Sequence, residues 1–391
     1  MSVRGACRVN HAWPLWTREA AFDRENLMSD ASAFSPDYVS ARARFRAAAH
    51  ALGARLEAHP IGIDGPDGEP LTLDVAVLGA TSPTRSVVVS SGLHGVEGFF
   101  GSAVQCALLE DVLGGFHLPD DGALVFLHAL NPYGFANLRR VNEGNIDLNR
   151  NFLREGEAYS GAPDGYAALD GLLNPPQPPG PGTRPLFYAR AVWNILRHGL
   201  PTLKQAVAGG QYAYQRGLFF GGSGPSRTQQ ILDAELPRWV GSARRVIHID
   251  FHTGLGARGT YKLFADHPWG SEQIRALADG FGHDRVEPWE PEQGVSYEIR
   301  GGLGAWCKAR LPSVEYDVLA AEFGTVHILK VIAALHEENR AHHWAQPTDP
   351  ATVAAKRRLR DVFAPPERAW RDAVVPKGIH IVQQAIEQVF A

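Results

Sequence analysis

The sequence predicts an α/β protein with strands and helices layered around a mostly parallel or mixed sheet. Short apolar runs bounded by turn residues indicate strands, and stretches of helical periodicity lie between them. This alternation along the chain is typical of layered α/β folds. With 391 residues, 45% of them hydrophobic, the chain is long enough to bury a full core.

The elements follow one another in a regular order after an irregular start. Residues 1–27 show no clean period, so we interpret them as a loose N-terminal extension ahead of a single domain over 28–391. A helix is predicted to begin after 35–37, where Ser-Pro-Asp precedes apolar residues at helical spacing. Strands are then predicted at 71–78, 86–91, 123–130, 246–251, 261–265 and 313–321. Further helices are predicted at 98–113, 271–281 and 325–344.

A proline-rich stretch interrupts this rhythm. Residues 174–182 read NPPQPPGPG, which has few backbone donors and fixed φ angles and so excludes a regular helix or a central strand. We interpret about 153–240 as an insertion that carries this loop and a helix near 186–196. The insertion is expected to pack over the domain and not to form a separate one.

Composition excludes several classes of protein. The formal net charge of -4 argues against a nucleic-acid partner, which calls for a basic excess. No apolar stretch approaches the roughly 20 residues that span a bilayer, and the first residues lack the apolar core of a signal peptide. Three widely separated cysteines favour a reducing compartment, so we expect a cytoplasmic protein without a membrane partner. The oligomeric state does not follow from the sequence.

Polar residues collect where predicted strands end, which is where α/β sheets bind ligands. His94 and Glu97 follow the strand 86–91, and an imidazole and a carboxylate on one short turn are donors that zinc accepts. His252 ends the strand 246–251 and could complete the ligand set, leaving a fourth position open as catalytic zinc requires. Helix-start and turn-capping roles are the alternatives for these residues. Asp250 and His248 share a strand face with His252, so either could contact it as a partner behind the metal. For His248 the alternative is a packed core residue.

A third polar segment lies in the sequence between Glu97 and His248. The sequence NPYGF at 131–135 is followed by Arg139, Arg140 and the run Asp-Leu-Asn-Arg-Asn-Phe at 147–152. Three guanidiniums within this segment are too polar for a core, and arginine binds carboxylates and developing oxyanions with a planar fork.

Together these motifs resemble the zinc carboxypeptidase (M14) superfamily and, more narrowly, its bacterial branch of DUF2817 proteins. The resemblance covers about 86–152 and 246–325. It implies a mixed, mostly parallel eight-stranded sheet sandwiched by helices, with one zinc ion per chain at the sheet edge. It also implies a zinc-dependent hydrolase that cleaves an amide bond in peptides or peptide-like small molecules with a free carboxylate.

The resemblance assigns the metal and its surroundings residue by residue. His94, Glu97 and His252 match the zinc ligands. Asp147 matches the carboxylate that orients the first histidine, which fixes the tautomer of that histidine. Glu322 matches the catalytic glutamate.

The remaining assignments concern the substrate. Arg140 matches the carbonyl-polarising arginine. Because Arg139 is adjacent, the alignment of the two arginines with that family position stays open, and Arg139 is assigned to substrate binding. Asn149 and Arg150 match the pair that grips the terminal carboxylate, and Tyr297 matches the mobile catalytic tyrosine. The specificity position corresponds to Gly304, so it predicts no side-chain preference.

Three alternatives stay open at this point. A deacylase of the aspartoacylase or succinylglutamate desuccinylase kind shares the same core motifs. A two-metal aminopeptidase needs further ligands that the sequence does not supply. A non-catalytic binding protein on the same fold would have kept the metal ligands without turnover.

Overall fold

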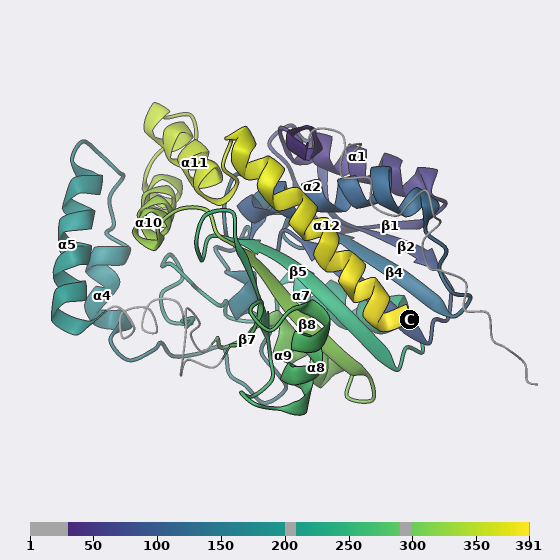
Figure 1. Ribbon diagram of the computed structural model, residues 1–391. Helices are drawn as coiled ribbons and strands as arrows, with labels where there is room; N and C mark the ends of the chain where they lie inside the picture. The colour runs from purple at the N-terminus through teal and green to yellow at the C-terminus, as the bar shows by residue number, and fades with distance from the viewer. Residues whose placement is uncertain (1–29, 200–208, 290–298, 391) are drawn as a thin grey trace, which may run out of the picture.

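The computed structural model describes residues 30–199, 209–289 and 299–390. Its centre is one eight-stranded mixed sheet in the order β1-β2-β4-β3-β5-β8-β6-β7 (Figure 1). Four neighbouring strands, β4, β3, β5 and β8, run parallel, and β2 and β6 flank them in the antiparallel direction. The expected mixed, mostly parallel eight-stranded sheet with flanking helices is thereby confirmed. The proposed extension 1–27 lies outside the described residues.

All six predicted strands are present, with ends that differ by a few residues. They are β2 (Pro70–Gly79), β3 (Arg85–Ser91), β4 (Gly122–His128), β5 (Arg245–Thr253), β6 (Tyr261–Ala265) and β8 (Glu315–Phe323). The two additional strands are β1 (Arg55–Asp64) and β7 (Val286–Pro288), one at each edge of the sheet. β3, β4 and β5 are buried along nearly their whole length, as expected for parallel strands that are covered on both faces.

Helices cover both faces of the sheet. One face packs against α2 (Gly98–Ala107), α8 (Glu272–Phe281) and α12 (Arg368–Phe390), and Figure 1 shows α12 running across the strands. The other face packs against α3 (Pro132–Ala136), α7 (Arg227–Val240) and α9 (Leu303–Arg310). α1 (Tyr38–Ala51) begins at Asp37, whose side chain accepts a hydrogen bond from the Ser40 amide, and it contributes to both clusters.

The segment 153–240 consists of two structurally different parts. α4 (Tyr166–Leu173) and α5 (Thr183–His198) lie beside α10 (Ile328–Trp344) at the margin of the molecule (Figure 1). α10 in turn packs against α11 (Pro350–Phe363). α7, by contrast, buries Ile231, Leu236 and Trp239 in the core against the sheet. The last part of the segment is therefore a core helix of the domain.

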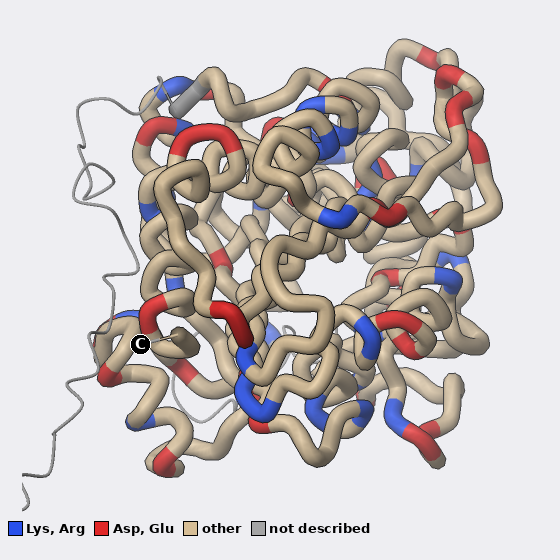
Figure 2. Tube along the Cα trace, turned by 90° about the vertical axis from the view of Figure 1, so that its right-hand side faces the viewer, with Lys and Arg blue, Asp and Glu red and all other residues tan. Residues whose placement is uncertain are grey.

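Charged residues of both signs are intermixed along the chain in the view of Figure 2. Within the described ranges, no helix has the length and apolarity needed to cross a membrane.

Candidate metal centre

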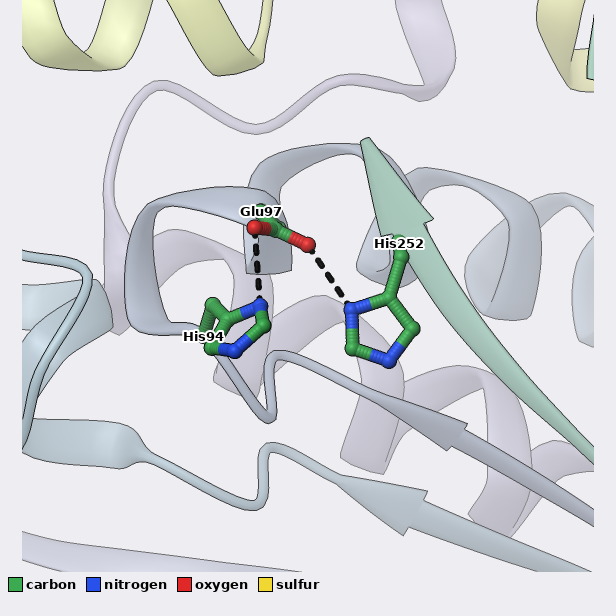
Figure 3. A group of neighbouring side chains, drawn as sticks. All are labelled: His94, Glu97 and His252. Carbon is green, nitrogen blue, oxygen red and sulfur yellow. Dashed lines mark hydrogen bonds and ion pairs between the residues drawn. The ribbon is translucent and has the colours of Figure 1, made fainter. Parts of the chain in front are cut away.

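His94, Glu97 and His252 converge at one point at the carboxyl ends of β3 and β5. Glu97 lies between the two imidazoles: its Oε1 is 2.9 Å from His94 Nδ1, and its Oε2 is 3.0 Å from His252 Nδ1 (Figure 3). The three ligand atoms lie within 4.8 Å of one another, and each residue is at least 95% buried. The structure thus brings together the three residues that the sequence predicts as metal ligands.

A short turn between β3 and α2 holds His94 and Glu97. The amides of Gly95 and Val96 donate to the carbonyls of Arg140 and Arg139, both at 3.0 Å. A Cβ at position 95 would lie 2.1 Å from the backbone of Gly134, so only glycine allows this close approach. The glycine in the His-Gly-Val-Glu sequence therefore docks the turn against the segment that carries the arginines.

Each histidine is oriented by a carboxylate behind it. Asp147 Oδ1 is 3.1 Å from His94 Nε2, and Asp250 Oδ2 is 2.7 Å from His252 Nε2. Asp250 also accepts a hydrogen bond of 2.6 Å from the Ser90 hydroxyl, which lies 2.7 Å from His248 Nε2. These contacts leave Nδ1 of both histidines facing Glu97, which is the arrangement that ligating histidines adopt.

The charges of this cluster suit a bound cation. Burial alone would raise the pKa of Glu97, but His94 and His252 lower it below its usual range. Burial would likewise lower the pKa of His252, yet Asp250 and Glu97 raise it well above the ordinary value. His94 Nδ1 is buried and has no hydrogen-bond partner among the described residues, although Glu97 Oε1 lies 2.9 Å away as an ion-pair contact. Two imidazole nitrogens and a carboxylate are ligands that zinc accepts. The cluster, in which His94 Nδ1 has no hydrogen-bond partner among the described residues, therefore fits a zinc ion.

The two adjacent arginines point to different places. Arg140 donates to Glu97 Oε1 at 3.0 Å and to Asp147 Oδ2 at 3.1 Å, so its charge lies beside the metal ligands. Arg139 is fully buried and donates to Glu338 of α10 at 2.8 Å and to Asn145 at 3.0 Å. Arg140 therefore lies beside the three predicted metal ligands, whereas the guanidinium of Arg139 forms a buried ion pair with Glu338.

Glu322 lies across from His252 on the neighbouring strand. β5 and β8 are parallel and in register, so that His252 and Glu322 are Cα partners. Glu322 is 8% exposed, and its carboxylate accepts a hydrogen bond of 2.8 Å from the Leu255 amide. Burial and then the nearby Glu97 raise the pKa of Glu322 to about 7.

The other predicted substrate residues follow Asp147. Asn149 lines a cavity that His252 also lines, and its Oδ1 accepts from the Leu303 amide at 3.1 Å. Arg150 is 1% exposed and donates to the Asn149 carbonyl at 2.6 Å. Tyr297 lies outside the described residues.

Three contributions were not predicted from the sequence. The Phe219 ring lies under both Arg140 and Arg150, with guanidinium carbons at 5.6 and 5.9 Å from its centre. Tyr212 donates to the Arg150 carbonyl at 2.7 Å, and the Phe220 carbonyl accepts from the Asp147 amide. Residues from the predicted insertion therefore support the site, a role that no local pattern indicates because it depends on long-range packing.

An α/β sheet with a buried His–Glu–His cluster at its edge defines a protein with a candidate mononuclear metal centre. More specifically, the chain belongs to the family described as "Protein of unknown function (DUF2817)", whose sequence model matches residues 34–377. No curated protein matches the sequence.

Several solved structures are similar to this chain at low identity. A carboxypeptidase A from Helicoverpa armigera is 13% identical, with a TM-score of 0.44 over 87% of this chain and 80% of that one. Bovine thrombin-activatable fibrinolysis inhibitor is 12% identical, with a TM-score of 0.42 over 90% and 98%. A murein-tripeptide amidase from Escherichia coli O157 is 18% identical, with a TM-score of 0.33 over 82% and 97%.

Proposed function

We propose that this protein is a zinc-dependent hydrolase that cleaves an amide bond next to a free carboxylate in a peptide or peptide-like molecule. The observation that carries the proposal is the register of β5 and β8, which sets Glu322 beside the His94, Glu97 and His252 cluster. A carboxylate with a pKa near 7 next to such a cluster is suited to general acid–base catalysis.

His94, Glu97 and His252 would hold the metal, and Asp147 and Asp250 would fix the two histidines. When bound, zinc supplies Lewis acidity and lowers the pKa of a coordinated water. Glu322 accepts a proton from the attacking water and later returns it to the leaving amine. Arg140, whose charge lies beside Glu97, stabilises the developing oxyanion.

The substrate's free carboxylate is assigned to Asn149 and Arg150. Asn149 lines the same cavity as His252, so an anionic end held by Asn149 would lie next to the reacting bond. Arg150 is buried directly after Asn149 and supplies the positive charge of this pair. An N-acyl amino acid also has an amide bond next to a free carboxylate, so it is a second candidate substrate. Neither candidate calls for a nucleic acid or a membrane surface.

The catalytic step is tested with Glu322→Gln. We expect the variant to keep its zinc and to lose about 10²–10⁴-fold in kcat, the usual contribution of a general base. Glu315→Gln, at the exposed start of the same strand, is the matched control. A zinc-loaded Glu322→Gln protein with the wild-type rate would refute the proposal.

The substrate class is tested with paired peptides and N-acyl amino acids that carry a free or an amidated C-terminus. Chelator-sensitive cleavage of the free-carboxylate member alone is the expected result. Equal cleavage of both members would remove the role assigned to Asn149 and Arg150.

A further inference from the structure

A cavity of about 330 Å³ lies beside the candidate metal centre. Its wall includes His252 and Asn149, and it includes Val318 and Ala320 of β8, which share a strand face with Glu322. The cavity thus adjoins the groups assigned to the metal, the proton transfer and the terminal carboxylate. The part of the substrate that carries the free terminal carboxylate and departs after cleavage would extend into this cavity.

One wall of this cavity is formed by Asp266, which follows the end of β6. No described side chain donates a hydrogen bond to its carboxylate or forms an ion pair with it. The ammonium group of Lys308 donates instead to the Asp266 backbone carbonyl at 2.7 Å and approaches His267 Nδ1 at 3.4 Å. His267 in turn pairs with Asp317 at 2.6 Å. Burial raises the pKa of Asp266, and Lys308 offsets this only in part, so the negative charge is poorly compensated.

Gly304 makes room for this carboxylate. A Cβ at position 304 would lie 2.1 Å from Asp266 Oδ2, so any larger residue would force the acid to move. Position 304, which predicted no side-chain preference, therefore acts by its lack of a side chain, because this leaves space for the neighbouring Asp266 carboxylate.

The remaining walls are largely apolar. Trp289, Leu303 and Val318 line the cavity together with Gly302 and Gly304. The lining also includes Asp250, whose carboxylate is already paired with His252 and accepts a hydrogen bond from Ser90. An aliphatic stem that ends in a cation would find hydrocarbon along its length and a carboxylate at its tip.

We propose that this cavity receives the side chain of the departing residue and that Asp266 selects one ending in an ammonium or guanidinium group. The preferred substrates are then peptides or acyl amino acids with a C-terminal lysine, arginine or related diamino acid. This inference rests on the proposed function, because it uses the same metal centre and the same carboxylate grip.

The test compares zinc-loaded full-length protein on acyl-dipeptides that end in lysine, norleucine or glutamate. Norleucine keeps the aliphatic stem and lacks the charge, so the lysine/norleucine ratio of kcat/KM measures the charge alone. We expect this ratio to be at least about tenfold, with glutamate the poorest of the three. Asp266→Asn should bring the ratio near one by lowering kcat/KM for lysine more than for norleucine, and Gly304→Ala should lower the ratio by displacing Asp266. Asp279→Asn, which removes an exposed acid from α8, is the charge-matched control.

A second readout does not depend on turnover. Calorimetry should detect binding of free L-lysine in preference to L-norleucine, and Asp266→Asn should abolish the difference. Selective lysine binding without hydrolysis of any substrate would support the cavity assignment and overturn the proposed function. Hydrolysis with equal rates for lysine and norleucine would overturn the role of Asp266 and leave the proposed function standing. Absence of both hydrolysis and selective binding would overturn both.

Discussion

His252 stands at the end of a buried chain of hydrogen bonds. Asp250 accepts from the imidazole, Ser90 donates to Asp250 and contacts His248, and the Tyr316 hydroxyl lies 3.1 Å from His248 Nδ1. Every member of the chain is buried, so loss of one partner leaves another polar atom unsatisfied. These hydrogen bonds fix which ring nitrogen of His252 faces Glu97.

Asp250→Asn should weaken zinc binding about 10–100-fold, the usual effect of removing a carboxylate behind a ligating histidine. The measurement is a competition titration against a chromogenic chelator. Asp233→Asn, an exposed acid on α7, is the control. An unchanged chelator midpoint for Asp250→Asn would show that this carboxylate does not orient the ligand.

Arg139→Met should lower the free energy of unfolding by about 3–5 kcal/mol, because it leaves Glu338 without its main buried partner. Urea denaturation measures the change. The double variant Arg139→Met/Glu338→Leu should recover part of the loss, since it removes both charges together. A single variant as stable as the wild type would contradict the assignment of Arg139 to a structural ion pair.

At the scale of elements, the sequence predicted the inner strands better than the edges. β3 and β5 are continuous apolar runs because both of their faces are covered, whereas β1 buries only Ile61 and contains Pro60, so it shows no alternation. α7 buries an apolar face, but it follows the proline-rich loop within 153–240, and its own pattern does not show that this face packs on the sheet. An edge strand or a covering helix is defined by its partner more than by its own pattern.

β1 and α7 are joined by an ion pair that should make stability depend on pH. Glu57 accepts from Arg238 at 2.6 Å and from the Trp239 indole at 3.0 Å, and Arg238 is the main cause that lowers the pKa of Glu57 to about 2. Since the folded pKa is depressed, the contribution is fully present above about pH 4.5 and is lost as the pH falls through 2.

Glu57→Gln should therefore reduce the free energy of unfolding by about 1–2 kcal/mol at pH 7, a figure discounted because Arg238 is half exposed. The difference from wild type should shrink as the pH is lowered from 4.5 towards 2. Glu235→Gln, which removes an acid that pairs with Arg238 within α7, should cost less than about 0.5 kcal/mol. A difference that stays constant with pH would exclude the ion pair as its cause.

At the scale of the whole molecule, the order of the motifs predicted that His94, Glu97 and His252 meet, although Glu97 and His252 are 155 positions apart in sequence. Two parallel strands with polar residues at their carboxyl ends must bring those residues together at one edge. The cavity could not be predicted in the same way. Asp266 and Gly304 belong to different elements, and neither has a local pattern that indicates the other.

Zinc should stabilise the fold, because its ligands come from two strand ends and are assembled only in the folded state. At a free zinc concentration of 1,000 times the Kd, the gain is about 4 kcal/mol, which should raise Tm by several degrees. A chelator should reverse the shift in calorimetry, and His252→Ala should abolish most of it. His283→Ala, an exposed histidine, should keep the full shift. Equal shifts in the two variants would place the zinc elsewhere.

The position of α12 in the chain has a consequence for how the protein is made. This helix follows every strand in sequence, and its buried residues, among them Ile379, Val382 and Ile386, cover β3 and β5. A ribosome therefore releases the whole sheet before the helix that shields one face of it. Until α12 docks, the nascent chain presents a broad apolar surface, so chaperone capture during translation should be concentrated between the synthesis of β8 and the docking of α12.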